Sequence, residues 1–153
     1  MAATLCVGPN GDCDGVSLGD CAVRMAKAGA DIVGLNCLFG PFVMLDCMKL
    51  MKEGLDKAGL KPHLMCQPLG YRVPDAGHFG WINIPEFPYA LEPRQITRFE
   101  AARYARELMI WVLDTSQAAA DSNPILPVKR SEKIVKRLEQ WFLVDLSFQQ
   151  FIF

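Results

Sequence analysis

Residues 31–41 read DIVGLNCLFGP. An apolar run of strand length leads into Cys37, and a glycine–proline turn follows at once. Residues 41–59 then read as a helix, with Pro41 in its first turn and Gly59 at its end. This stretch therefore predicts a strand that ends at Cys37 and turns tightly into a helix.

A similar unit stands on either side of this stretch. Residues 3–8 (ATLCVG) predict a strand, and residues 17–29 predict a helix with apolar residues at helical spacing and Gly29 after its end. Residues 61–71 predict a third strand. A long loop rich in proline and glycine follows over residues 72–95, and then a helix over residues 96–108.

The start of the third helix carries a local signal. Thr97 precedes Glu100 by three residues, which is the pattern of a capping box. Three strands alternate with three helices, and this alternation predicts an α/β fold with right-handed βαβ crossovers and a parallel sheet. Cys6, Cys37 and Cys66 mark the strand ends at intervals of 31 and 29 residues. That interval is typical of one βα unit of a (β/α)8 TIM barrel, and a three-layer open sheet fits nearly as well.

Composition limits the classes of protein that fit this chain. It has 153 residues, of which 51% are hydrophobic and 22% charged, as expected for one globular domain. The net charge of -1 does not favour nucleic-acid binding, and no apolar run is long enough for a membrane span. Six cysteines follow a start that does not resemble a signal peptide, so we expect a reducing, cytoplasmic setting.

The cysteines are the main candidates for chemistry. Sites in parallel α/β folds form at the carboxyl ends of strands, where Cys6, Cys37 and Cys66 are expected, and zinc binds thiolates. The alternative is that all three are buried small hydrophobic side chains. Spacing alone favours that alternative, because no CxxC or HExxH motif is present. In the loop, the charged residues Glu86, Glu92 and Arg94 stand in an apolar setting and are expected to form a buried or partly buried ion pair that fixes its shape.

Three segments carry a resemblance to a known family. GLNCLFGP, LMKEGLDKAGLKPHLMCQPLGY and INIPEFPYALEPRQITRFEAARYARE occur in the same order in betaine–homocysteine S-methyltransferases, and the likeness covers roughly residues 2–107. The resemblance implies part of a zinc-dependent TIM barrel, its fifth to seventh βα units. It also implies methyl transfer from betaine to homocysteine, which gives methionine and dimethylglycine. Cys37 matches the first zinc ligand of that family.

The chain departs from the family pattern in two ways. The family's usual NCHFDP reads NCLFGP here, with Leu38 and Gly40 substituted, and the later GGCCG with the other two zinc ligands is absent. Residues 1–107 are thus expected to form a partial homocysteine-binding barrel. Residues 108–153 are expected to be a divergent tail, with an amphipathic helix suggested by apolar residues at helical spacing within it.

Three functional hypotheses follow from these departures. The chain is a fragment or variant of the methyltransferase that is inactive alone, or a noncatalytic module that pairs with a full-length relative. The third is an independent enzyme in which substitute ligands join Cys37 around zinc. Because a partial barrel has open sheet edges, we also expect self-association through them.

Overall fold

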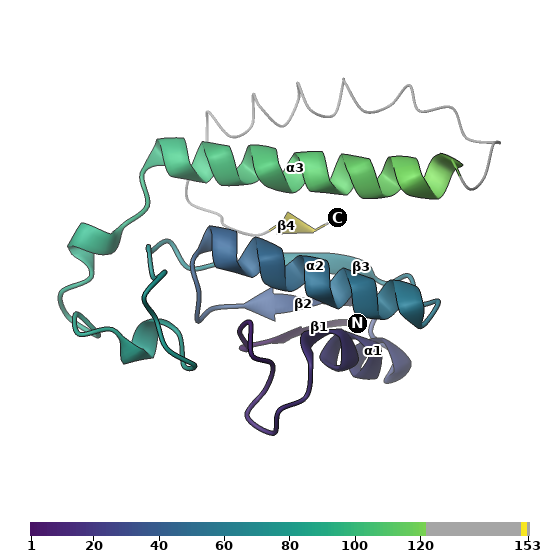
Figure 1. The fold of residues 1–153 in the computed structure, drawn as a ribbon, viewed down its shortest axis with the longest axis horizontal. Coiled ribbons are helices and arrows are strands. Elements are labelled where there is room, and N and C mark those ends of the chain that lie inside the picture. The colour runs from purple at the N-terminus through teal and green to yellow at the C-terminus, as the bar shows by residue number, and fades with distance from the viewer. Residues whose placement is uncertain (122–150, 153) are drawn as a thin grey trace. The chain divides into compact units, whose positions relative to one another are not determined.

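The computed structural model describes residues 1–121 and 151–152. The chain divides into two compact units, one made of residues 1–96 with the last strand and one that begins at Thr97. The described elements are β1 (Ala2–Leu5), α1 (Leu18–Lys27), β2 (Ile32–Asn36), α2 (Pro41–Lys57), β3 (His63–Gln67), α3 (Arg98–Asp121) and β4 (Phe151–Ile152), as Figure 1 shows. The predicted order of three strands and three helices is confirmed.

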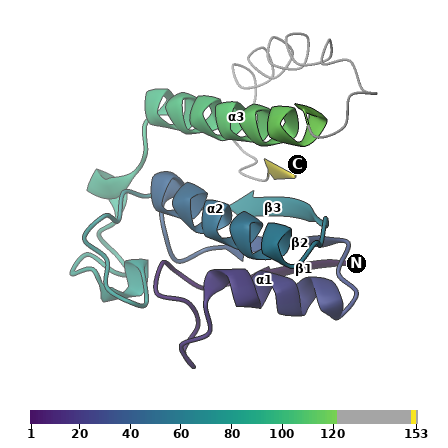
Figure 2. The same ribbon diagram turned by 45° about the vertical axis from the view of Figure 1, so that its right-hand side comes forward.

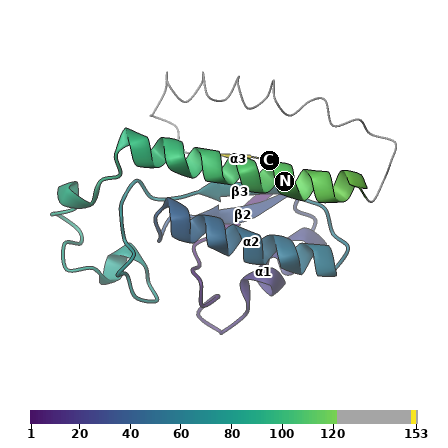
Figure 3. The same ribbon diagram turned by 45° about the horizontal axis from the view of Figure 1, so that its top comes forward.

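β1, β2 and β3 lie side by side in chain order and run parallel. Leu5 is aligned with Leu35, and Leu35 with Cys66. Because the strands follow one another in chain order, two crossovers of the same hand place both connecting helices on one face of the sheet. Figures 2 and 3 show α1 and α2 next to each other on that face. This layering is consistent with a segment of a barrel, and one half of a three-layer open sheet shares it.

Local sequence signals explain where α1 and α2 begin and end. The backbone N–H of Asp20 donates to the Ser17 side-chain oxygen at 3.1 Å and caps the start of α1. α2 begins at Pro41, whose missing N–H costs nothing at a first helical position. Gly29 and Gly59 follow the two helices with φ of 96° and 70°, a left-handed conformation that glycine adopts without strain.

The core lies between the sheet and its two helices. On β2 and β3, alternate side chains such as Val33, Leu35 and Cys66 are completely buried. Met44, Met48 and Met51 are spaced along one face of α2 and are buried as well. α1 and α2 pack with their backbones in contact, because a Cβ on Gly54 would lie 2.3 Å from the Cα of Gly19.

The other face of the sheet is only partly covered. The side chains that alternate with the core residues, including Thr4, Asn36, Met65 and Gln67, are half-buried. β3 pairs with β4 in antiparallel register, so one edge of the parallel sheet has a neighbour from the end of the chain. Among the described residues, β1 pairs only with β2, which leaves its outer edge open.

α3 opens the second unit with the predicted capping box. The Thr97 backbone N–H donates to a Glu100 carboxylate oxygen at 2.8 Å, and the Glu100 N–H donates back to the Thr97 hydroxyl at 3.3 Å. The helix runs to Asp121, well past the predicted end, because no glycine or proline interrupts it. The amphipathic helix expected in the tail, within residues 128–146, lies outside the described residues. No helix in the described part of the chain is long and apolar enough to cross a membrane.

The loop over residues 72–95 has a small core of its own. Val73, Ile84 and Leu91 are buried together, and Trp81 packs against them. The Trp81 ring also stacks on Tyr71 at a centroid distance of 6.0 Å. Backbone hydrogen bonds close the base of the loop, including one from the Arg72 N–H to the Arg94 carbonyl at 2.6 Å. A loop that carries its own packing holds a definite shape over the end of the sheet.

Candidate functional site

Cys37 stands directly after β2, at the carboxyl end of the sheet, as predicted. Its side chain is half-buried. Cys37 and Leu38 both have φ of 60°, so two consecutive non-glycine residues occupy the left-handed region. This conformation is costly for residues with a Cβ and persists only where the surroundings enforce it. The chain reverses through this pair and enters α2 at Pro41.

Backbone hydrogen bonds fix the turn on both sides. The Cys37 N–H donates to the Gln67 carbonyl at 3.0 Å, and the Leu69 N–H donates to the Phe39 carbonyl at 2.9 Å. From the loop, the Trp81 N–H donates to the Leu38 carbonyl at 2.9 Å. The end of β3 and the loop over residues 72–95 therefore hold the turn that carries the candidate thiol.

The other two strand-end cysteines do not join Cys37 around a metal. Cys66 lies inside β3 rather than at its end, and its side chain is completely buried beneath the helices. Cys6 follows β1 and is exposed, so the expectation that it packs in the core is wrong. Its sulfur lies on the partly covered face and accepts a hydrogen bond from the Asn36 side-chain amide at 3.0 Å. The alternation of side chains along the strands separates these thiols.

Other cysteines are ordinary core residues or loop residues. Burial raises the pKa of the Cys47 thiol on α2 to about 12, with a smaller contribution from Asp46. Burial also raises the pKa of the Cys21 thiol on α1, and the nearby Asp12 carboxylate adds to the effect. Both side chains pack in the core, and neither is poised as a thiolate nucleophile. Cys13 is exposed in the loop before α1.

The expected ion pair in the loop is present between Glu86 and Arg94, and its second carboxylate comes from Asp75 rather than from Glu92. The Arg94 guanidinium lies 2.9 Å from a Glu86 carboxylate oxygen and makes two hydrogen bonds to Asp75, at 2.6 and 2.8 Å. Hydrogen bonds from Arg94 lower the pKa of both the Asp75 and the Glu86 carboxyl. Asp75 is 19 residues from Arg94 and was not expected at this site. The cluster braces the loop that contacts the Cys37 turn.

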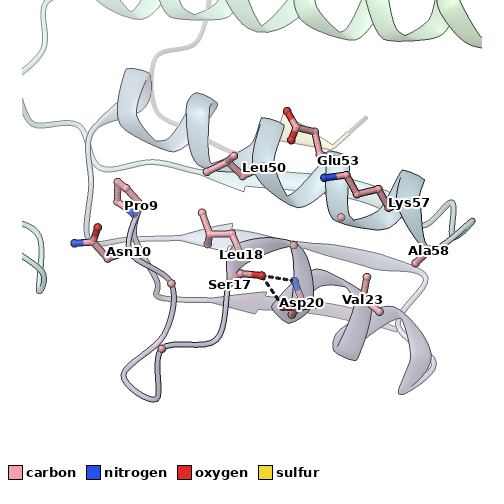
Figure 4. Close-up of a pocket in the computed structure, with 14 residues that line it drawn as sticks. Pro9, Asn10, Ser17, Leu18, Asp20, Val23, Leu50, Glu53, Lys57 and Ala58 are labelled. Carbon is pink, nitrogen blue, oxygen red and sulfur yellow. Dashed lines mark hydrogen bonds between the residues drawn. The ribbon is translucent and has the colours of Figure 1, made fainter.

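A pocket of about 620 Å³ opens between the start of α1 and one side of α2. Figure 4 shows Ser17 and Asp20 at the start of α1, and Glu53 and Lys57 on α2. Cys37 does not line this pocket. The Ser17 hydroxyl is already used, because it caps α1 and donates to the Asp20 carboxylate at 2.8 Å. The pocket therefore lies apart from the candidate thiol and contributes no group to it.

Zinc can be tested against these residues through the donor atoms they bring together. Every cysteine and both histidines of the chain fall among residues 6–78, within the described part. In that part, no three His, Cys, Asp or Glu side chains form a group that could hold a metal ion. Structural and catalytic zinc sites use three or four protein ligands, so the described residues do not fit a zinc centre.

Comparison with known proteins bears directly on this arrangement. No family model matches the chain. A betaine–homocysteine S-methyltransferase 1 from Bos taurus is 59% identical over 107 residues, or 70% of this chain and 26% of that protein. The protein of the same name from Xenopus tropicalis is also 59% identical over 107 residues, 70% of this chain and 27% of its own length.

A relative named for a different methyl donor is almost as similar. An S-methylmethionine–homocysteine S-methyltransferase from Rattus norvegicus is 55% identical over 107 residues, 70% of this chain and 30% of that protein. The resemblance to betaine–homocysteine S-methyltransferases is thereby confirmed. The chain spans only about a quarter to a third of the length of these relatives.

Proposed function

We propose that residues 1–107 are a segment of a homocysteine S-methyltransferase TIM barrel, its fifth to seventh βα units, and that the chain alone does not transfer methyl groups. The observation that carries this proposal is the parallel order of β1, β2 and β3, with both helices on one face. A barrel repeats that layering eight times. Identity of 59% to betaine–homocysteine S-methyltransferases supports the same origin.

The proposed boundary at residue 107 marks the end of the resemblance, not the end of a structural element. α3 continues from Arg98 to Asp121 without a break. The tail after residue 107 is thus joined to the preceding segment by a continuous helix rather than by a flexible linker at that position. We propose that this tail replaces the part of the barrel that would follow.

The substrates of the intact enzyme are proposed to be homocysteine and betaine, in the cytoplasm. The relatives' names agree on homocysteine and differ on the donor, betaine or S-methylmethionine. Betaine is preferred because the identity to the betaine enzymes is somewhat higher, 59% against 55%. Cys37 is proposed to occupy the position of a zinc ligand. Because its partners are missing from the described residues, no catalytic step is assigned to zinc in this chain.

Zinc content and methyl transfer test the proposal together. The reduced chain, Cys37→Ala and Cys13→Ala would be freed of loosely bound metal and analysed for zinc per chain. Cys13→Ala is the matched control, because that thiol is exposed in a loop away from the strand ends. We expect well below one zinc in all three proteins and no methionine from betaine and homocysteine. One zinc per chain that disappears only in Cys37→Ala would contradict the proposal.

The second candidate function is a noncatalytic module that pairs with a full-length relative. It is favoured by the open edge of β1, whose sequence AATL has no charge or proline to discourage strand pairing. Sedimentation of the chain over a concentration series, alone and with the full-length methyltransferase, tests this function. Ala2→Lys should weaken association and Cys13→Lys should not, since both positions are exposed but only Ala2 lies on the edge strand. A chain that stays monomeric and does not bind the full-length methyltransferase at any concentration would rule out the noncatalytic module.

A further inference from the structure

The turn at Cys37 and Leu38 depends on a segment more than forty residues away in sequence. Two neighbouring left-handed residues with side chains are unfavourable by themselves. Gly34 and Gly40 flank the pair in sequence, but the pair contains no glycine to relieve it. Contacts from elsewhere must therefore hold the conformation.

Gly80 supplies the tightest of those contacts. It is itself left-handed, with φ of 60°, and it is buried. A Cβ at this position would lie 2.1 Å from the Leu38 carbonyl oxygen and 2.7 Å from its carbon. Real Cβ atoms do not approach backbone so closely, and the contacted group is the Leu38 peptide, which cannot move aside by changing a rotamer. Only glycine permits the loop to reach the turn.

The neighbouring residue completes the contact. The Trp81 N–H donates to the same Leu38 carbonyl at 2.9 Å, so the loop both touches and hydrogen-bonds the second residue of the left-handed pair. The Trp81 ring is held in turn by Tyr71 and Phe87, with centroids 6.0 and 5.2 Å away. Figure 1 shows the loop leaving β3 at the end of the sheet where β2 turns into α2.

We propose that Gly80 and Trp81 are positioning residues for the Cys37 thiol. Their contact with the Leu38 carbonyl holds the left-handed pair, and the pair sets the direction and the exposure of the sulfur. This deepens the proposed role of Cys37, but it concerns the geometry of the thiol and requires no bound metal. The positioning role and zinc binding are therefore independent, so the failure of one proposal does not decide the other.

Alkylation of Cys37 by iodoacetamide, measured for each cysteine by mass spectrometry, tests the proposal on the full chain. The exposed Cys13 serves as internal reference for reagent and pH. Gly80→Ala should raise the ratio of Cys37 to Cys13 labelling roughly fivefold. The left-handed conformation costs about 1 kcal/mol per residue, so releasing one residue from it shifts the equilibrium toward the relaxed conformation by about that factor. Gly59→Ala is the matched control, with a φ of 70° and nothing within 4 Å of its Cβ.

Coupling to Leu38 separates positioning from general loosening. In a Leu38→Gly background the carbonyl can move at little cost, so adding Gly80→Ala should leave the labelling ratio nearly unchanged. An effect of Gly80→Ala that persists in full in this background would overturn the proposal. So would a Gly80→Ala ratio equal to that of Gly59→Ala.

A gentler pair of variants covers the case in which Gly80→Ala does not fold. Trp81→Ala removes the ring that anchors the contact and adds no clash, and it should raise the Cys37 ratio by a smaller factor. Ile82→Ala is the control, because this neighbouring side chain is half exposed and does not belong to the stack. Equal ratios in Trp81→Ala, Ile82→Ala and the unchanged chain would also overturn the proposal.

Discussion

Truncation of one side chain on each face of the sheet tests whether the second face is only partly covered. Leu35 on β2 is completely buried against the helices, whereas Met65 on β3 points to the other face and is half-buried. Leu35→Ala should cost about 3 kcal/mol, from lost burial and the cavity it leaves. Met65→Ala should cost about 1 kcal/mol, because much of its surface already meets water. The folded-to-unfolded ratio would then fall more than a hundredfold in the first variant and roughly fivefold in the second.

Urea unfolding followed by far-UV circular dichroism gives both values. With a slope of about 1–3 kcal/mol per molar urea, Leu35→Ala should lower the midpoint by roughly 1–3 M and Met65→Ala by less than half as much. The measurement is repeated at two protein concentrations, since a partner on the open face would make the cost of Met65→Ala rise with concentration. Equal costs at low concentration would refute the one-sided core.

Two further predictions concern the loop and the helix pair. The Asp75 and Glu86 carboxylates facing Arg94 have pKa values below their ordinary 3.8 and 4.5, so the folded chain binds fewer protons than the unfolded chain. The resulting stabilisation is complete above about pH 5 and is lost as the pH falls through that range, so the melting temperature of the unchanged chain should drop more between pH 6 and 4 than that of Arg94→Met. Parallel curves for the two proteins would argue against a role for the Asp75 cluster. Gly54→Ala places a methyl group 2.3 Å from the Cα of Gly19 and should lower the free energy of unfolding in urea by about 1–3 kcal/mol. The control Glu53→Ala, on the exposed side of α2, should change it by no more than about 0.5 kcal/mol. If Gly54→Ala is tolerated, the two helices separate easily.

Elements with strong local signals could be predicted from the sequence. Pro41 starts α2, Gly59 follows its end, and Thr97 with Glu100 caps α3, because each of these residues acts on its own turn of backbone. The parallel order of the strands followed from the alternation of strands and helices. The choice between a barrel and a three-layer open sheet did not follow from it, because three consecutive strands with both helices on one face occur in both architectures.

The arrangement around Cys37 depended on contacts that local patterns do not encode. Cys66 was expected at a strand end, but β3 continues to Gln67 and its alternation turns Cys66 toward the helices. A left-handed Cys37 and Leu38 are not foreseeable, because neither residue type favours that conformation. The contact from Gly80 joins positions that are 42 residues apart, and only the folded loop brings them together.

Heat opens first the parts of a fold with the least free energy in reserve. The free energy of opening the left-handed pair after β2 is small, because contacts from the covering loop hold its conformation. The strands, in contrast, are joined by a cooperative ladder of backbone hydrogen bonds. Fluctuations that lift the loop would release the pair while β2 and β3 remain joined. Cys37 is then a built-in reporter of sub-global opening, a sulfur whose accessibility follows the premelting of one corner well before the sheet unfolds.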